Sequence, residues 1–188
     1  MKTRSILLVI ALIPVSFISC SKINDALTVK VPVEFTNDLQ VHDSTPGLKS
    51  TTGLYDFYAS EAFNPSTDAT VIKYKSKIKS ITASGISYTP SGLSGDVTVT
   101  NAYFTISTQE NSYWGLTVEW SFTSLTLRNG VKVDLPSPKL GTLADISTML
   151  DGDKVIYLTW AGSQNVPVND YTFSTTLNAE VLAYLLKK

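Results

Sequence analysis

Histidine and cysteine are the side chains that most often carry nucleophilic or metal-assisted catalysis, and each occurs once in this chain, as His42 and Cys20. A serine–histidine–acid triad could therefore use only His42, which lies in the polar stretch LQVHDSTPG. No G-x-S-x-G motif or similar nucleophile elbow accompanies it, so we interpret His42 as a solvated loop side chain. A structural zinc site is excluded because the chain has too few histidine and cysteine ligands.

Acidic residues offer two further kinds of chemistry. Asp151-Gly152-Asp153, with Asp145 nearby, is the best cluster of oxygen ligands for calcium, but the EF-hand spacing is missing and the same residues are typical of a turn that ends a helix. A glycosidase needs two carboxylates that face one cleft. The candidates are scattered and share no motif: Asp56, Glu61, Glu110 and Glu119. We therefore expect no catalytic residue, no metal site and no cofactor, and a carboxylate-dependent hydrolase remains only a minor alternative.

Aromatic residues are the most informative candidates in the rest of the chain. Tyr113 and Trp114 end the stretch QENSYWG, which is typical of a loop that opens a strand. Exposed aromatic rings at such a place can stack on sugars or anchor a protein partner. Trp114 also begins a period-two series that is typical of a core stripe: Leu116, Val118, Trp120 and Phe122. Tyr113 is the aromatic that we most expect in solvent, and Tyr113 and Trp114 are the candidate ligand-binding residues.

Cys20 ends an N-terminal segment of unusual composition. Lys2 and Arg4 precede an uncharged run from Ser5 to Ser19, which is the layout of a secretory signal peptide. The apolar run is too short to span a bilayer comfortably, since a span needs about 20 apolar residues. No cysteine follows Cys20, so the rest of the chain forms no internal disulfide and depends on its hydrophobic core for stability.

The residues Phe17-Ile18-Ser19-Cys20 resemble the lipobox of bacterial lipoproteins, in the looser form of Bacteroidota-type lipoproteins. The resemblance covers the signal peptide and lipobox only, and it assigns the mature domain to no characterised family. It implies that Cys20 carries lipid on its sulfur, with palmitate as the expected acyl group, and becomes the acylated N-terminus. Two or three acyl chains hold a protein stably on a membrane. The alternatives are an ordinary signal peptide that contains a cysteine, and an uncleaved anchor.

This resemblance divides the chain into a signal peptide at 1–19, a lipidated cysteine with a short tether at 20–26, and a domain at 27–188. An aspartate directly after the lipidated cysteine resembles an inner-membrane retention signal. Ser21 stands there instead, which favours the outer membrane. The acidic run that often marks surface export is absent, so the periplasmic face is favoured over the cell surface.

The charge balance argues against nucleic acid as a partner. Without Lys2 and Arg4, the 15 basic residues fall to 13, against 16 acidic residues. Nucleic-acid binding needs a basic patch, and the one basic cluster here follows a single short segment: Lys73, Lys75, Lys77 and Lys79. We interpret this cluster as a solvated face of one element.

Hydrophobic periodicity predicts mainly strands. Alternation over 27–35 predicts a strand, at an edge or with a bulge because of Pro32, followed by a polar loop or irregular hairpin over 36–53. Residues 54–63 fit either a strand or a helix. A helix capped by Ser66 or Thr67 is predicted over 67–77. Further strands are predicted over 78–89, with a bend near Gly85, and over 96–107, 114–127, 131–135 and 154–161, the last with Trp160 in the core.

The C-terminal part contains three more specific signals. The residues Arg128-Asn129-Gly130 predict a hairpin with a three-residue loop in which Gly130 is left-handed. This register pairs Leu127 with Val131 and Leu125 with Val133, which places the four apolar side chains on one face. Thr142 and Asp145 resemble a capping box that begins a short helix ending at Asp151-Gly152. Alternation over 173–185 predicts a strand, and a helix over 178–186 is the alternative.

Together these patterns predict a mainly β fold: a single antiparallel β-sandwich domain with two short helices. We expect a lipid-anchored cell-envelope binding or assembly module without catalytic activity, whose partners are the membrane, through Cys20, and an envelope protein or a glycan. A glycan-binding lipoprotein that uses loop aromatics is the main alternative. A hydrolase requires a cleft with two close carboxylates, and glycan binding requires coplanar exposed rings. Assembly requires an apolar patch or an open edge strand.

Overall fold

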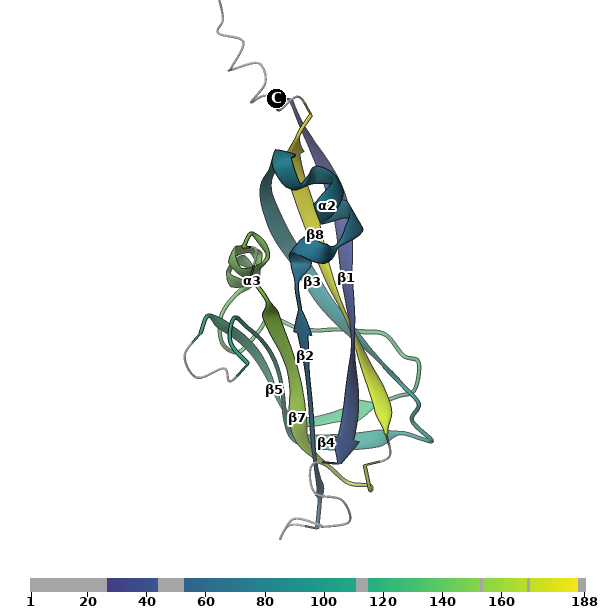
Figure 1. Cartoon of the computed structure of the whole chain (residues 1–188). Coiled ribbons are helices and arrows are strands. Elements are labelled where there is room, and N and C mark those ends of the chain that lie inside the picture. Colours follow the sequence, from purple (N-terminus) through teal and green to yellow (C-terminus); the bar gives the residue numbers. More distant parts are fainter. Residues whose placement is uncertain (1–26, 44–52, 111–114, 153, 169, 186–188) are drawn as a thin grey trace, which may run out of the picture.

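The computed structural model describes residues 27–43, 53–110, 115–152, 154–168 and 170–185. Within them the chain forms strands and two short α-helices, α2 (Ala69–Tyr74) and α3 (Leu143–Leu150), as Figure 1 shows. The strands are β1 (Thr28–Asp43), β2 (Tyr55–Phe63), β3 (Ile78–Ser91), β4 (Val97–Ser107), β5 (Thr117–Leu127), β6 (Val133–Asp134), β7 (Ile156–Gln164) and β8 (Tyr171–Tyr184). The predicted fold class, mainly antiparallel β with two short helices, is confirmed.

The strands form one curled sheet in the order β5-β4-β7-β2-β1-β8-β3-β6, and the paired strands are antiparallel. The curl divides it into two halves, β5-β4-β7-β2 and β1-β8-β3-β6. A short ladder joins them, in which His42 lies opposite Tyr58 and Asp43 opposite Phe57. Residues 28–41 of β1 pair with β8 alone among the described strands, so Pro32 lies on an open strand edge, where its missing N–H is tolerated.

Aromatic rings fill the space between the two halves. Trp160 of β7 stacks on Phe173 of β8 with ring centroids 4.5 Å apart and ring planes at 10°, and Phe173 stacks on Tyr88 of β3 at 4.7 Å and 14°. Large rings bury much apolar area, so this stack is a major source of stability. Trp120 and Trp160 are buried, as their phase predicts. Leu116 was predicted to share the core stripe with Trp120, but it is 38% exposed because it precedes the first paired residue of β5.

Strand β1 is longer than its alternation predicts. The polar loop or irregular hairpin expected from residue 36 is wrong as far as residue 43, because the ladder with β8 continues to Val41 opposite Tyr171. Leu39 and Val41 keep the buried phase. On the outer face, Ser174 donates a 2.6 Å hydrogen bond to Asp38. Polar outer residues, together with Asn37 on the inner phase, therefore hid a strand whose other inner residues here are apolar.

The two ambiguous segments are both strands. Residues 55–63 form β2, and residues up to Tyr184 form β8, whose side chains alternate between buried and half-buried along the whole strand. The predicted strand is confirmed, and the helical alternative for 178–186 is wrong for the residues that the structure describes. The bend expected near Gly85 is also confirmed, since the register with β8 shifts between Ala83 and Gly85.

The predicted hairpin around Gly130 is wrong. Gly130 does have a positive φ of 70°. However, β5 pairs with β4, which places Leu127 opposite Val97 and Leu125 opposite Val99. The chain after the turn crosses to the other half, where Val133 lies opposite Tyr88. The reason is that β4 offers β5 a longer ladder than the two residues of β6 can.

The helices are fixed by their caps. The predicted caps Ser66 and Thr67 are wrong: Asp68 caps α2 by accepting hydrogen bonds from the N–H groups of Thr70 and Val71, and short 3₁₀ turns at Pro65–Thr67 and Lys75–Lys77 flank the helix. The capping box of α3 is confirmed, because Thr142 and Asp145 exchange backbone and side-chain hydrogen bonds. In the described part of the chain, neither helix is long or apolar enough to cross a bilayer.

Candidate ligand-binding face

Several residues singled out in the sequence have no site around them or are not described. Cys20, Tyr113, Trp114 and Asp153 lie outside the described residues. His42 is the next-to-last residue of β1 rather than a loop residue, and its Nδ1 atom is 3.0 Å from the exposed carboxylate of Asp170.

The calcium candidates have structural roles in the part of the chain that the structure describes. Asp151 accepts a hydrogen bond from the N–H of Ile81, which ties the end of α3 to β3. Asp145 belongs to the capping box at the start of the same helix. Among the described residues, no group of three or more histidine, cysteine or acidic side chains is placed to hold a metal ion.

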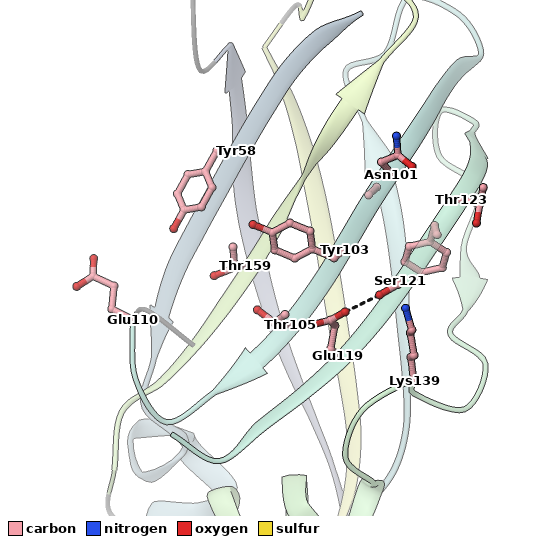
Figure 2. Close-up of a pocket in the computed structure, with 12 residues that line it drawn as sticks. Tyr58, Asn101, Tyr103, Thr105, Glu110, Glu119, Ser121, Thr123, Lys139 and Thr159 are labelled. Carbon is pink, nitrogen blue, oxygen red and sulfur yellow. Dashed lines mark hydrogen bonds between the residues drawn. The ribbon is translucent and has the colours of Figure 1, made fainter. Parts of the chain in front are cut away.

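The clearest concave site is an open pocket of about 500 Å³ on the outer face of the half β5-β4-β7-β2 (Figure 2). Its lining is rich in hydroxyl, carboxylate and aromatic groups: Tyr58, Asn101, Tyr103, Thr105, Glu110, Glu119, Ser121, Thr123, Lys139 and Thr159. This face points away from the aromatic core. It is therefore available to a ligand at no cost to the packing between the halves.

Two tyrosines form a cross-strand row on this face. Ala161 of β7 lies opposite Tyr58 of β2 on one side and opposite Tyr103 of β4 on the other. Residues directly opposite each other in a sheet project to the same face, so both rings stand on the outer surface. Tyr58 is 46% exposed and Tyr103 is 39% exposed, whereas the small Ala161 between them is only 5% exposed. The strands that carry the rings are separated by one strand, or about 10 Å.

A row of polar groups lies beside the tyrosine row. Ser60, Thr159, Thr105 and Glu119 are successive cross-strand partners over β2, β7, β4 and β5. The hydroxyls of Ser60 and Thr159 are 3.3 Å apart, and the carboxylate of Glu119 accepts a 2.5 Å hydrogen bond from the hydroxyl of Ser121. The face thus presents two rings next to a strip of hydrogen-bonding groups, as Figure 2 shows.

A bulge in β4 places Tyr103 in this row. The register with β7 shifts between Thr100 and Tyr103, and Asn101 within it has a positive φ of 48°. Gly162 of β7 allows the strands to meet there, because a Cβ atom on it would lie 2.6 Å from the Cα atom of Ala102. The extra residue in β4 brings Tyr103, rather than Ala102, opposite Ala161.

The connection after β6 supplies the basic group of the pocket. The N–H of Lys139 donates a 2.7 Å hydrogen bond to the carbonyl of Glu119, and Leu140 forms an isolated bridge to the same residue. The indole of Trp120 donates a 2.7 Å hydrogen bond to the carbonyl of Pro136, which holds this connection against β5. Lys139 therefore shares the pocket with two carboxylates, Glu110 and Glu119.

Sequence reasoning missed Tyr58 and Tyr103. A signal was available, because each tyrosine lies between two residues that face the core: Phe57 and Ala59 around Tyr58, and Ala102 and Phe104 around Tyr103. An aromatic residue on the outer phase of a strand is predicted to be exposed, which makes it a candidate for surface binding. Their proximity could not be read in the same way, since it depends on which strands pair.

Comparisons with known proteins supply no family. No family model matches the chain, and no curated protein matches it. A solved structure from Desmodium yellow mottle tymovirus is similar with 10% identity and a TM-score of 0.35, over 100% of this chain and 95% of the other. A semi-empty virus-like particle of Macrobrachium rosenbergii nodavirus has 7% identity and a TM-score of 0.33, over 85% of this chain and 97% of the other. A structure from turnip yellow mosaic virus has 11% identity and a TM-score of 0.30, over 84% of this chain and 98% of the other. Similarities at these TM-scores carry no functional argument.

Proposed function

We propose that this protein is a lipid-anchored module of the bacterial cell envelope that binds glycans on the outer face of the half β5-β4-β7-β2. The observation that carries the proposal is the exposed tyrosine row, Tyr58–Ala161–Tyr103. The sequence favours a binding or assembly module, and its alternative of glycan recognition assigns that role to the loop aromatics Tyr113 and Trp114. The proposal transfers that role to two aromatics held by strands, which are positioned more rigidly than loop residues.

The chemistry of the face suits a sugar. A pyranose ring has an apolar C–H face that stacks on an aromatic ring, and a rim of hydroxyls that needs hydrogen-bonding partners. Tyr58 and Tyr103 offer the rings. Glu119 of the neighbouring row and Ser121, the cross-strand partner of Tyr103, offer the hydrogen-bonding partners, whereas Thr105 and Thr159 of the lining are buried. The spacing of about 10 Å between the two tyrosine-bearing strands leaves room for more than one sugar unit.

The position of the pocket is consistent with a tethered binding module. Tyr58 lies opposite His42, near the end of β1 that is remote from the N-terminal segment. The 15 residues from Thr28 to His42 make 14 steps of about 3.3 Å each, which span roughly 45 Å. A domain held at Cys20 would therefore present the tyrosine row well above the membrane surface. The preferred location is the outer membrane, with the periplasmic face favoured over the cell surface.

A carboxylate-dependent hydrolase is the second candidate, because Glu110 and Glu119 line the same pocket. Under this alternative Glu119→Gln abolishes turnover of a bound glycan and leaves its binding largely intact. If the protein only binds, no product forms with either the original chain or the variant. Incubation of the bound oligosaccharide followed by mass spectrometry of the sugar distinguishes the two.

Two experiments test the proposal. Membrane fractionation of cells compares the original chain with Cys20→Ala, and only the original chain is expected to stay with the membrane. An oligosaccharide array then compares the purified original chain with the double variant Tyr58→Ala/Tyr103→Ala and with Val131→Ala, an exposed apolar residue outside the pocket lining. The double variant should lose about tenfold or more in affinity, since each stacked ring contributes roughly 0.5–1.5 kcal/mol beyond its buried area.

The control Val131→Ala should bind like the original chain. If the original chain binds no glycan, or if the double variant binds as well as the original, the tyrosine row is not a glycan site. If Cys20→Ala fractionates with the membrane like the original chain, the lipid anchor is wrong.

A further inference from the structure

The turn that follows β5 lies against the connection between β3 and β4. A 3.2 Å hydrogen bond from the N–H of Val131 to the carbonyl of Arg128 closes this turn. Gly130 occupies its third position with a φ of 70°, which glycine adopts without strain. Because the chain crosses to the other half of the sheet after the turn, the turn contacts residues that are distant in sequence.

Two hydrogen bonds fasten the turn to the end of β3 and the connection that follows it. The N–H of Gly130 donates a 2.7 Å hydrogen bond to the carbonyl of Pro90. The side-chain oxygen Oδ1 of Asn129 accepts a 3.1 Å hydrogen bond from the N–H of Leu93. The backbone nitrogen of Gly130 and the side-chain amide of Asn129 are therefore both engaged in the folded domain.

These two groups can also react with each other. After base removes its proton, the nitrogen of Gly130 can attack the side-chain carbonyl carbon of Asn129, which forms a cyclic succinimide. The bond from this carbon to the side-chain nitrogen breaks, and the nitrogen leaves as ammonia. Water then opens the ring at either carbonyl and gives aspartate or isoaspartate, so the reaction needs no oxidant or reductant. Glycine favours the attack because it has no side chain to hinder the approach.

Asn129 is the only asparagine of the chain that precedes a glycine. Asn165 is the internal comparison, because its Oδ1 atom also accepts a hydrogen bond from a backbone N–H, that of Thr98 at 3.0 Å. Val166 follows Asn165, and its branched side chain crowds the nitrogen that would have to attack. The two asparagines therefore share a kind of hydrogen bond and differ in the residue that follows.

The folded turn opposes the reaction at Asn129. The carbonyl of Pro90 holds the proton that base must remove from Gly130, and the N–H of Leu93 holds the side-chain carbonyl of Asn129 in place. Asn129 itself is exposed, so water reaches it. The rate is therefore limited by local opening of the turn and not by access of water.

We propose that Asn129 is a modification site: it loses its side-chain amide to water when the turn opens, and the hydrogen bonds to Pro90 and Leu93 suppress this reaction in the folded domain. In the isoaspartate product the backbone runs through the side chain and is longer. The N–H of Gly130 then no longer meets the carbonyl of Pro90, so the modified turn loses its attachment to β3. This inference is independent of the glycan and lipid proposals.

Peptide mass spectrometry of the full chain tests the site. The chain is incubated at mildly alkaline pH, either folded or unfolded in guanidinium chloride, and the replacement of the side-chain amide by an acid is followed with time. Conversion of Asn129 should be at least about tenfold slower in the folded chain, because two hydrogen bonds must open first. Asn165 should remain unconverted in both states.

Equal conversion rates of Asn129 in the two states would overturn suppression by the fold. No conversion of Asn129 in the unfolded chain, or conversion of Asn165 at the same rate, would overturn the modification site. Hydrogen exchange of the Gly130 amide gives a second measure of opening. At low denaturant its exchange and the conversion of Asn129 should accelerate together, and a conversion that accelerates alone would contradict the role of the Pro90 hydrogen bond.

Refolding of the converted chain tests the structural consequence. Chains with isoaspartate at position 129 should unfold at a lower denaturant concentration than the original chain. Asn129→Asp is the matched control, because it keeps the normal backbone and an oxygen that accepts from the N–H of Leu93, and its midpoint should stay close to that of the original chain. Equal midpoints for the isoaspartate chain and Asn129→Asp would overturn the predicted loss of attachment.

Discussion

Gly162 and Ala102 face each other so closely that a Cβ atom on Gly162 would lie 2.6 Å from the Cα atom of Ala102. The contact lies at the bulge of β4, where Asn101 has a positive φ and the register with β7 changes. This bulge places Tyr103 opposite Ala161. The shape of the candidate binding face therefore depends on Gly162, although Gly162 does not itself line the pocket.

Gly162→Ala should therefore destabilise the fold and displace Tyr103. Overpacking of this kind costs about 1–3 kcal/mol of unfolding free energy, because backbone atoms rather than a flexible side chain must move. Urea unfolding followed by tryptophan fluorescence measures the loss. Gly95→Ala is the matched control, since nothing lies within 4 Å of a Cβ atom at that position, and it should change stability by no more than about 0.5 kcal/mol. Equal effects of the two variants would contradict the close contact.

The buried Tyr171 predicts a loss of stability at alkaline pH. Burial raises the pKa of Tyr171 to about 12, and the hydrogen bond from the indole of Trp160 opposes this only in part. Between about pH 10 and about pH 12 the unfolded chain releases the phenolic proton and the folded chain keeps it. The free energy of unfolding therefore falls by about 1.4 kcal/mol per pH unit in this window, and below it Tyr171 contributes no pH dependence.

Tyr171→Phe should remove this part of the alkaline loss. At neutral pH the variant is weaker by about 1 kcal/mol, because the indole N–H of Trp160 loses its acceptor. Urea midpoints measured near neutral pH and at about pH 11 give the difference between the original chain and the variant at each pH. Tyr88, whose pKa is also raised by burial, keeps its own alkaline contribution in both proteins. A difference that does not change with pH would contradict the prediction.

The capping box of α3 should contribute measurably to stability. Thr142→Ala removes the side-chain acceptor for the N–H of Asp145 and should cost about 1 kcal/mol. Thr148 is an exposed threonine inside the same helix whose hydroxyl donates to the carbonyl of Ala144. Thr148→Ala should be neutral or slightly stabilising, because alanine has the higher helix propensity. Thermal unfolding of the two variants, which make the same chemical change, provides the comparison.

If Tyr103 stacks on a sugar, its ring matters more than its hydroxyl. Tyr103→Phe keeps the ring and should retain most of the glycan affinity, whereas Tyr103→Ala should lose about three- to tenfold. Titration of the strongest array ligand by calorimetry measures both affinities. A loss with Tyr103→Phe as large as that with Tyr103→Ala would show that the hydroxyl, rather than stacking, carries the interaction.

The sequence predicts which side chains of a strand face the core wherever one face of the strand is apolar. Residues 171–184 alternate without interruption, and β8 follows that phase along its whole length. The capping box at Thr142 and Asp145 was equally accessible, because it is closed by residues three positions apart. Residues 36–43 were misread as a loop or irregular hairpin because Thr36, Asp38 and Gln40 face solvent and made the segment look polar.

The sequence did not predict which strands pair with each other. Leu125 and Leu127 lie opposite Val99 and Val97, and not opposite Val133 and Val131 as the nearest turn suggested. A turn favours the neighbour in sequence, but the final partner is the strand that offers the longer ladder and the larger buried face.

The sequence by itself therefore determined the local features of this protein: an N-terminal segment that resembles a lipoprotein signal, strands with a defined inner face, and a capped helix. The tertiary structure decided that Tyr58 and Tyr103, 45 positions apart, lie on either side of Ala161 in one exposed row. The physical reason is that the direction of a side chain follows from the two-residue period of its own strand, whereas its neighbours are set by competition among all strands for partners.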